Sequence, residues 1–126
     1  MLRKLRYLEW DEFDQAVNDI VDKVKDLHIT SIYGEPRGGL TLAVALSHKL
    51  NKPLTDSVKV GTLWVDDIVE TGKTMNKVKE PAVFYAAWFG SNKLKSLHYA
   101  ATFSKNDWFV FPWEEQSKVR EDMMQY

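Results

Sequence analysis

Two adjacent carboxylates and a turn with phosphate-binding character lie close together in residues 63–75, which read LWVDDIVETGKTM. Asp66 and Asp67 follow an apolar run, so we expect them to end a strand with their side chains on opposite faces. Ionised carboxylates only accept hydrogen bonds, and beside a phosphate they suit sugar hydroxyls or a magnesium ion. The alternative, two solvated loop residues, fits poorly with the apolar strand that leads into them.

Residues 71–74, TGKT, have the residue types of an anion-binding turn. Gly72 has no Cβ, so the backbone can turn sharply and approach a ligand. A short helix is expected over residues 72–79, and its free N–H groups would point at the turn. A Walker A loop needs a glycine five positions before Gly72, where this chain has Asp67, so that motif is excluded. Thr71 as a simple helix cap is the remaining alternative.

A second candidate for anion binding is the segment EPRGG, residues 35–39. Pro36 stiffens the entry, and Gly38 and Gly39 permit unusual dihedral angles with exposed amides. Arg37 supplies a planar cation whose geometry matches phosphate oxygens. Taken alone, such a turn is common and is weak evidence for a binding site.

Helix and strand patterns alternate along the chain. Apolar spacings of three and four predict a helix over residues 10–27, and an apolar segment predicts another over 40–50. This alternation predicts an α/β fold: a single domain over 1–126 with a mainly parallel central sheet flanked by helices. Ligands of such sheets bind beyond the carboxyl ends of the strands, which would bring the two candidate loops into one crevice. Strands are expected over 29–35, 61–67, 82–89 and 96–103 and near Leu54, an edge piece or loop over 108–113, and a helix-prone tail over 114–126.

The composition narrows the class of protein. The chain has 126 residues and no cysteine, which excludes disulfides and thiol nucleophiles, and its three histidines have no ligand spacing. With 17 basic and 18 acidic residues the net charge is −1, which gives no electrostatic case for nucleic-acid or membrane binding. No apolar run is long enough to span a bilayer, and the N-terminal residues make a poor signal peptide. We therefore expect a cytoplasmic protein.

Residues 63–75 resemble the 5-phosphoribosyl-1-pyrophosphate (PRPP) binding motif of type I phosphoribosyltransferases: an apolar strand, two acids, two apolar residues, an acid, and Thr-Gly-x-Thr. The segment IYGEPRGGL, residues 32–40, resembles their pyrophosphate-binding loop. WFVFPWE, residues 108–114, is similar to the segment that closes the base pocket in the xanthine/guanine branch. The resemblance covers roughly residues 10–115. It implies a type I phosphoribosyltransferase-like fold and transfer of a phosphoribosyl group from PRPP to a purine base, with Mg²⁺ as cofactor and pyrophosphate as leaving group.

The resemblance also implies a role for each matching residue. Asp66 and Asp67 would bind the ribose hydroxyls, and Asp67 would also contact the magnesium ion. Glu70, where the family usually has aspartate, would lie near the purine nitrogen that attacks the sugar and would act in catalysis. The other implied contacts are Thr71, Gly72, Lys73 and Thr74 with the 5′-phosphate, Arg37, Gly38 and Gly39 with pyrophosphate, Trp108 stacked on the base, and the Phe109 backbone at its exocyclic group.

Two departures from the family pattern leave alternatives open. Family members usually carry a long flexible loop before the PRPP motif, whereas this chain has only residues 51–61 there, which implies a reduced hood. The family strand that commonly supplies a lysine to the base has AAWF at residues 86–89, so Lys93 or Lys95 is a candidate substitute. The alternatives to transfer are a weak or inactive regulatory module that binds PRPP or a nucleotide, and hydrolysis of PRPP. A homodimer, common in the family, is also expected.

Overall fold

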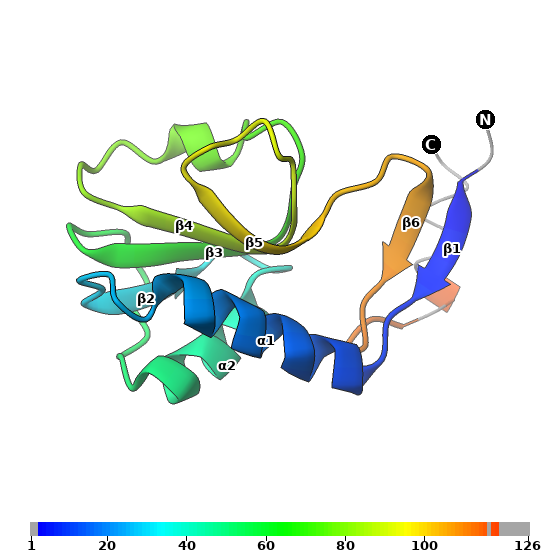
Figure 1. Cartoon of the computed structure of the whole chain (residues 1–126), viewed down its shortest axis with the longest axis horizontal. Coiled ribbons are helices and arrows are strands. Elements are labelled where there is room, and N and C mark those ends of the chain that lie inside the picture. Colours follow the sequence, from blue (N-terminus) through cyan, green and yellow to red (C-terminus); the bar gives the residue numbers. More distant parts are fainter. Residues whose placement is uncertain (1–2, 116, 119–126) are drawn as a thin grey trace. The chain divides into compact units, whose positions relative to one another are not determined.

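The computed structural model describes residues 3–115 and 117–118 (Figure 1). Contacts within the chain define two compact units, one of Ala16–Phe103 and one built from Met1–Gln15 and Ser104–Tyr126. Helix α1, Trp10–Val24, contributes residues to both units. The expected single domain over 1–126 stays a prediction.

The unit of residues 16–103 is built on a four-stranded, entirely parallel sheet in the order β2-β3-β4-β5. The strands are β2 (Ser31–Gly34), β3 (Thr62–Val69), β4 (Phe84–Gly90) and β5 (Leu97–Thr102). Purely parallel strands are normally covered on both faces and are therefore apolar throughout. Strand β3 follows this rule, because Leu63, Trp64 and Val65 are all fully buried. The predicted α/β class with a mainly parallel sheet is confirmed.

Helix α2 (Leu40–Leu50) covers one face of this sheet and has the bounds that the sequence predicted. It packs on β2 and β3, and Figure 1 shows α1 lying on the same side of the sheet. The close approach of α2 depends on Gly34, where an added Cβ would lie 2.9 Å from the Cβ of Ala43. The helix ends at Asn51, whose φ of 54° is left-handed, as is common for a residue that ends a helix.

The opposite face carries a second apolar cluster that includes Trp64, Met75 and Leu97. The segment after the TGKT turn covers part of it, but the predicted helix over 72–79 is wrong. Only a short 3₁₀ turn forms, η1 (Met75–Lys77). The N–H groups of Lys77 and Val78 donate to carbonyls three residues back, and only that of Asn76 reaches four back, to Gly72. Val78 then returns to extended backbone at ψ 122° before Pro81. The turn therefore supplies no helix dipole of useful length.

Strand β3 is longer than predicted, which corrects the assignment of Asp66 and Asp67 to a strand end. Ile68 and Val69 continue the ladder by pairing with residues of β4, so the two aspartates lie within the strand. The segment near Leu54 is smaller than predicted, a single bridge to Ile32 rather than a strand. Strand β3 is longer because β4 pairs with Ile68 and Val69. The segment near Leu54 has a bridge partner in β2 only at Ile32, so it does not form a strand.

The smaller unit contains a two-stranded parallel sheet of β1 (Lys4–Tyr7) and β6 (Asp107–Val110). Strand β1 was not predicted, because KLRY carries two cations and becomes a strand only through its partner. Residues 108–113, predicted as an edge piece or loop, contribute most of β6, and Pro112 follows the end of the strand. The tail predicted over 114–126 lies mostly outside the described residues.

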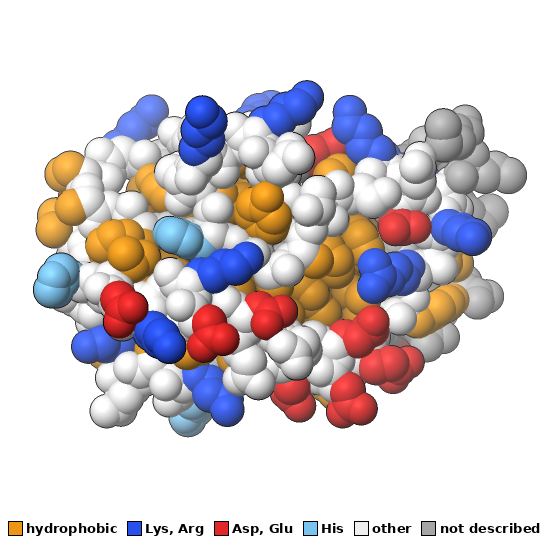
Figure 2. All heavy atoms as spheres, in the orientation of Figure 1, with side chains coloured by type: hydrophobic (Ala, Val, Ile, Leu, Met, Phe, Trp, Pro, Cys, Tyr) orange, Lys and Arg blue, Asp and Glu red, His pale blue; other side chains and the backbone are white. Residues whose placement is uncertain are grey.

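Acidic side chains gather over α1 on the face shown in Figure 2. The helix sequence WDEFDQAVNDIVDKV contains five acidic residues. Such a surface disfavours a polyanionic partner. In the described part of the chain, no helix is both long and apolar enough to cross a membrane.

Candidate active site

The two predicted anion loops meet at one edge of the sheet, because each follows one of two neighbouring parallel strands. The N–H of Glu35, just after β2, donates to the carbonyl of Val65 in β3 at 2.8 Å. The N–H of Gly39 then donates to the carbonyl of Glu35 at 2.9 Å and closes the turn. The peptide bond between Pro36 and Arg37 is cis. The loop of residues 35–39 is therefore held directly against β3.

Gly38 and Gly39 are needed for this contact because neither position has room for a side chain. A Cβ on Gly38 would lie 2.3 Å from Oδ2 of Asp67. A Cβ on Gly39 would lie 2.3 Å from the carbonyl oxygen of Val65 and 3.0 Å from the Cα of Asp66. The first loop and the paired acids, predicted separately from the sequence, thus touch one another. Arg37 is exposed beside them.

The paired aspartates are organised by their own backbone. The N–H of Asp67 donates to Oδ1 of Asp66 at 2.8 Å, and the N–H of Ile68 donates to Oδ1 of Asp67 at 2.7 Å. Burial raises the pKa of Asp66 to about 8, with further upward contributions from Asp67 and Glu35. This shift favours the protonated form of Asp66 in the ligand-free pair, and a protonated carboxyl can donate a hydrogen bond to a sugar hydroxyl.

Glu35 and Trp64 are site residues that the sequence analysis missed. The indole N–H of Trp64 donates to Oε1 of Glu35 at 3.1 Å, which joins β3 to the first loop. Trp64 and Asp66 are two residues apart in the strand and so share a face of the sheet. That alternation was the one available signal, since nothing local indicated that Glu35 would find an indole partner.

The second loop is open and polar. Glu70, Thr71, Lys73 and Thr74 are exposed, while Gly72 is buried with φ 81°, the left-handed conformation for which glycine is suited. The Thr71 hydroxyl accepts a hydrogen bond from the N–H of Lys73 at 3.3 Å. The loop and Asp66 enclose a cavity of about 70 Å³. Because η1 is so short, an anion bound here would have to be held by the loop's amides, hydroxyls and lysine rather than by a helix dipole.

A larger hollow of about 450 Å³ lies between the two loops. Glu35 contributes to it from the first loop and Thr74 from the second, with Trp64 between them. Lys77 and Lys79 add positive charge to its wall. The tyrosine of this wall, Tyr33, has a pKa raised by burial and by the charge of Glu35. The edge of the sheet therefore offers one continuous concave surface from the first loop to the second.

The carboxylates at this edge of the sheet suit a magnesium ion that is coordinated partly by a bound substrate. Among the described residues, no group of three or more histidine, cysteine or acidic side chains is arranged to hold a metal. Mg²⁺ usually takes one or two carboxylates together with water and substrate phosphates. Asp66 and Asp67 supply carboxylates of that kind, so the residues present fit a metal that arrives with a phosphorylated substrate.

The predicted base-contacting residues lie in the other unit, on β6. The guanidinium of Arg3 lies 5.2 Å from the ring centroid of Trp108, and that of Arg6 lies 5.7 Å from the ring of Phe109. Arg3 was not singled out from the sequence. The contacts of Trp108 and Phe109 with a base stay predictions.

The residues at which the sequence departs from the family's base-contacting strand lie in β4. Ala86, Ala87, Trp88 and Phe89 are buried within the strand. Lys93 and Lys95 are exposed in the connection that follows, where the N–H of Lys93 donates to the Ser91 hydroxyl at 3.2 Å. The role of either lysine stays a prediction.

Comparison with known proteins agrees with the motifs. No protein-family model matches the chain. A xanthine-guanine phosphoribosyltransferase from Chromohalobacter salexigens is 24% identical over 133 residues, covering 85% of this chain and 82% of the relative. The chain thus resembles type I phosphoribosyltransferases near the xanthine/guanine branch.

Solved structures of phosphoribosyltransferases have the same fold. The purine phosphoribosyltransferase from Pyrococcus horikoshii matches with a TM-score of 0.71 at 28% identity, covering 88% of this chain and 95% of that one. The xanthine-guanine-hypoxanthine phosphoribosyltransferase from Helicobacter pylori also has a TM-score of 0.71, at 20% identity, covering 94% and 99%. The relatives support a phosphoribosyltransferase function.

Proposed function

We propose that this protein is a magnesium-dependent phosphoribosyltransferase that transfers the 5-phosphoribosyl group of PRPP to a purine base. The products would be pyrophosphate and a nucleoside 5′-monophosphate. The observation that carries the proposal is the contact between Gly38 and the carboxylate of Asp67. It joins a pyrophosphate-type loop to a ribose-type acid pair, and the phosphate-type turn follows on the same strand. One ligand, a sugar with phosphates at both ends, accounts for all three.

The mechanism would rest on positioning and electrostatics. The amides and hydroxyls of residues 71–74 hold the 5′-phosphate, and Asp66 and Asp67 bind the ribose hydroxyls. Arg37 and the loop amides beside it hold the pyrophosphate group. The bond from C1 to the pyrophosphate oxygen breaks, and a bond forms from C1 to a purine ring nitrogen. Glu70 takes the proton of that nitrogen. Fixed charges around the sugar stabilise its cation-like transition state and so lower the activation barrier.

A bound magnesium ion would neutralise charge on the pyrophosphate. Asp67, with Asp66 beside it, is the residue proposed to meet it. Trp108 would stack on the base, the Phe109 backbone would meet its exocyclic group, and Lys93 or Lys95 would replace the usual base-contacting lysine. We place the activity in the cytoplasm and propose a homodimer, with no nucleic-acid or membrane partner.

One assay tests the reaction. Protein, Mg²⁺ and PRPP are mixed with a panel of purine and pyrimidine bases, and both pyrophosphate and nucleotide are followed. Pyrophosphate release that requires a purine supports the proposal, whereas release without any base indicates hydrolysis. Tight PRPP binding without turnover would instead support the regulatory module. The short segment 51–61, which forms a single bridge to Ile32, leaves little chain for a lid, and this observation is the reason to keep that second candidate.

Glu70→Gln separates catalysis from binding. If Glu70 accepts the proton, kcat falls by about 100-fold or more while the dissociation constant for PRPP stays near that of the native chain. Glu9→Gln is a matched control, because Glu9 is also exposed but lies outside both loops and the hollow between them. Unchanged kcat in Glu70→Gln would remove the catalytic role, and equal losses in both variants would show a general charge effect.

A further inference from the structure

The connection between β4 and β5, residues 91–96, packs against the second loop of the candidate site. The N–H of Ser91 donates to the carbonyl of Val69 at 3.0 Å, which fixes the start of this connection beside the end of β3. Further along, Leu94 contacts Gly72: a Cβ added to that glycine would lie 3.1 Å from Cδ2 of Leu94 and 3.4 Å from its Cδ1. The two segments therefore meet at two points, one just before the loop of residues 70–74 and one within it.

The position of Leu94 is fixed by its own connection and by the core. Its N–H donates to the carbonyl of Ser91 at 3.2 Å, and its carbonyl accepts from the N–H of Leu97 at 3.2 Å. Its side chain is partly buried against the apolar cluster that includes Trp64 and Met75. Leu94 is thus a well-anchored side chain with Gly72 on one side and the apolar cluster on the other.

Gly72 is the residue of the second loop that this contact restrains. It is buried and has the left-handed φ of 81°, although the residues on either side of it are exposed. The only element that follows the loop before β4 is the short turn η1, so no helix holds the glycine in place. Its carbonyl accepts one hydrogen bond, from the N–H of Asn76 at 2.7 Å. The apolar packing of Leu94 on Gly72 therefore supplies a restraint that the loop itself lacks.

We propose that Leu94 is a positioning residue for the phosphate-type turn of residues 71–74 and that it acts through Gly72. By packing on the glycine, Leu94 keeps the amides and hydroxyls of the turn in the arrangement that receives a 5′-phosphate. Groups that are ordered before a ligand arrives bind it more tightly, because less conformational entropy is lost on binding. This role rests on the proposed function, since it takes the turn to be the site of the 5′-phosphate.

Leu94→Ala should loosen the turn in the ligand-free chain. Amide exchange followed by NMR measures this directly, because the N–H of Asn76 donates to the carbonyl of Gly72. Exchange of this amide should become about tenfold faster, whereas that of Ser91, bonded to Val69 outside the turn, should change by less than about twofold. Leu94→Met, which has a similar volume, should restore the native rate. An unchanged rate at Asn76 in Leu94→Ala would overturn the proposal, and this measurement requires no ligand.

Calorimetry with two partial ligands separates positioning of the turn from a general loss of structure. Ribose 5-phosphate carries only the 5′-phosphate, whereas inorganic pyrophosphate with Mg²⁺ would bind at the first loop. In Leu94→Ala, the dissociation constant of ribose 5-phosphate should rise by about tenfold while that of pyrophosphate stays at its native value. Equal losses for both ligands would contradict the role of Leu94. A native chain that binds neither ligand would count against the proposed function, and the Asn76 amide would still decide whether Leu94 positions the turn.

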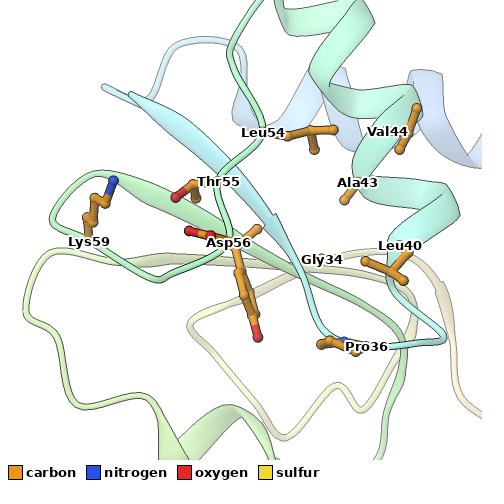
Figure 3. Close-up of a pocket in the computed structure, with 10 residues that line it drawn as sticks. Gly34, Pro36, Leu40, Ala43, Val44, Leu54, Thr55, Asp56 and Lys59 are labelled. Carbon is orange, nitrogen blue, oxygen red and sulfur yellow. The ribbon is translucent and has the colours of Figure 1, made fainter.

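Leu54→Ala is the matched control, because Leu54 is also a leucine in a connection between two elements. It lies on the wall of a groove of about 690 Å³ beside β2, between α2 and residues 54–59 (Figure 3). None of residues 70–74, all of which the structure describes, lines that groove. The control should therefore leave both the Asn76 exchange rate and the affinity for ribose 5-phosphate unchanged. Changes as large as those of Leu94→Ala would show that the contact with Gly72 is not their cause.

Discussion

The two loops of the candidate site are held in opposite ways. The loop of residues 35–39 is packed against β3 so tightly that two of its glycines have no space for a methyl group. The loop of residues 70–74 is exposed, with a small cavity beside it. The first loop is thus part of the scaffold that fixes the acids, while the second would present its exposed groups to the proposed ligand. Substitutions should separate these roles. Those in residues 35–39 should lower the free energy of unfolding, whereas those in residues 70–74 should lower the affinity for PRPP.

Gly39→Ala should have the largest effect, because its Cβ would meet main-chain atoms of β3 rather than a mobile side chain. The φ of Gly39 is −84°, so the cost comes from the close approach and not from its dihedral angle. We expect the free energy of unfolding to fall by about 3 kcal/mol or more, measured by urea denaturation. A loss below about 0.5 kcal/mol would show that the loop is not packed on the strand.

Gly38→Ala should displace the Asp67 carboxylate with only a small loss of stability, although it lies in the same loop. Here the added Cβ meets the carboxylate of Asp67, which can rotate away. We expect a stability loss of only about 1 kcal/mol, because a side chain rather than the main chain moves. Turnover of PRPP should fall by about 100-fold, since a misplaced carboxylate no longer meets the ribose. Native turnover in a folded variant would contradict the role of Asp67.

Asp66→Asn should change how stability depends on pH in buffer without magnesium or PRPP. The pKa of Asp66 is raised from 3.8 to about 8 in the folded chain. Between these values the unfolded chain releases a proton that the folded chain keeps, so the native protein loses stability as pH rises through this window. Asn cannot ionise, so the free energy of unfolding of this variant should fall by about 1–3 kcal/mol less than that of the native chain over this pH window. Urea denaturation at several pH values measures the difference. The control is Asp26→Asn, because Asp26 is exposed and lies outside the site. Its free energy of unfolding should depend on pH in the same way as that of the native chain.

Thr71→Ala should have the smallest effect and should act on affinity alone. The hydroxyl belongs to the open loop, where its bond to the Lys73 amide is exposed and 3.3 Å long. We expect unfolding to change by less than about 0.5 kcal/mol. Affinity for PRPP should fall by about tenfold, as for one lost hydrogen bond to a charged group, measured by calorimetry. Thr71→Ser should restore binding, and Thr102→Ala should leave it unchanged.

Local patterns predicted most of the larger unit. Helix α2 was predicted with its observed bounds, because its apolar run ends at a clear break, NKP. Gly72 was predicted for the right physical reason, a sharp turn, and it has a left-handed φ of 81°. Gly38 and Gly39 were expected to adopt unusual dihedral angles, but neither has a positive φ, and their close approach to β3 is what requires them. The helix over 72–79 failed because propensity alone could not show that the chain returns to extended backbone at Val78.

By itself, the sequence determined the alternating α/β order and the residue types of both loops, since helix periodicity, turn residues and acid pairs are local signals. Only the tertiary structure decided which of these residues touch. The contact of Gly38 with Asp67 and the bond from Trp64 to Glu35 join residues about 30 positions apart. The groove beside β2 likewise needs a helix and a distant connection to be packed together. Such contacts depend on strand order and register, which no short stretch of sequence encodes.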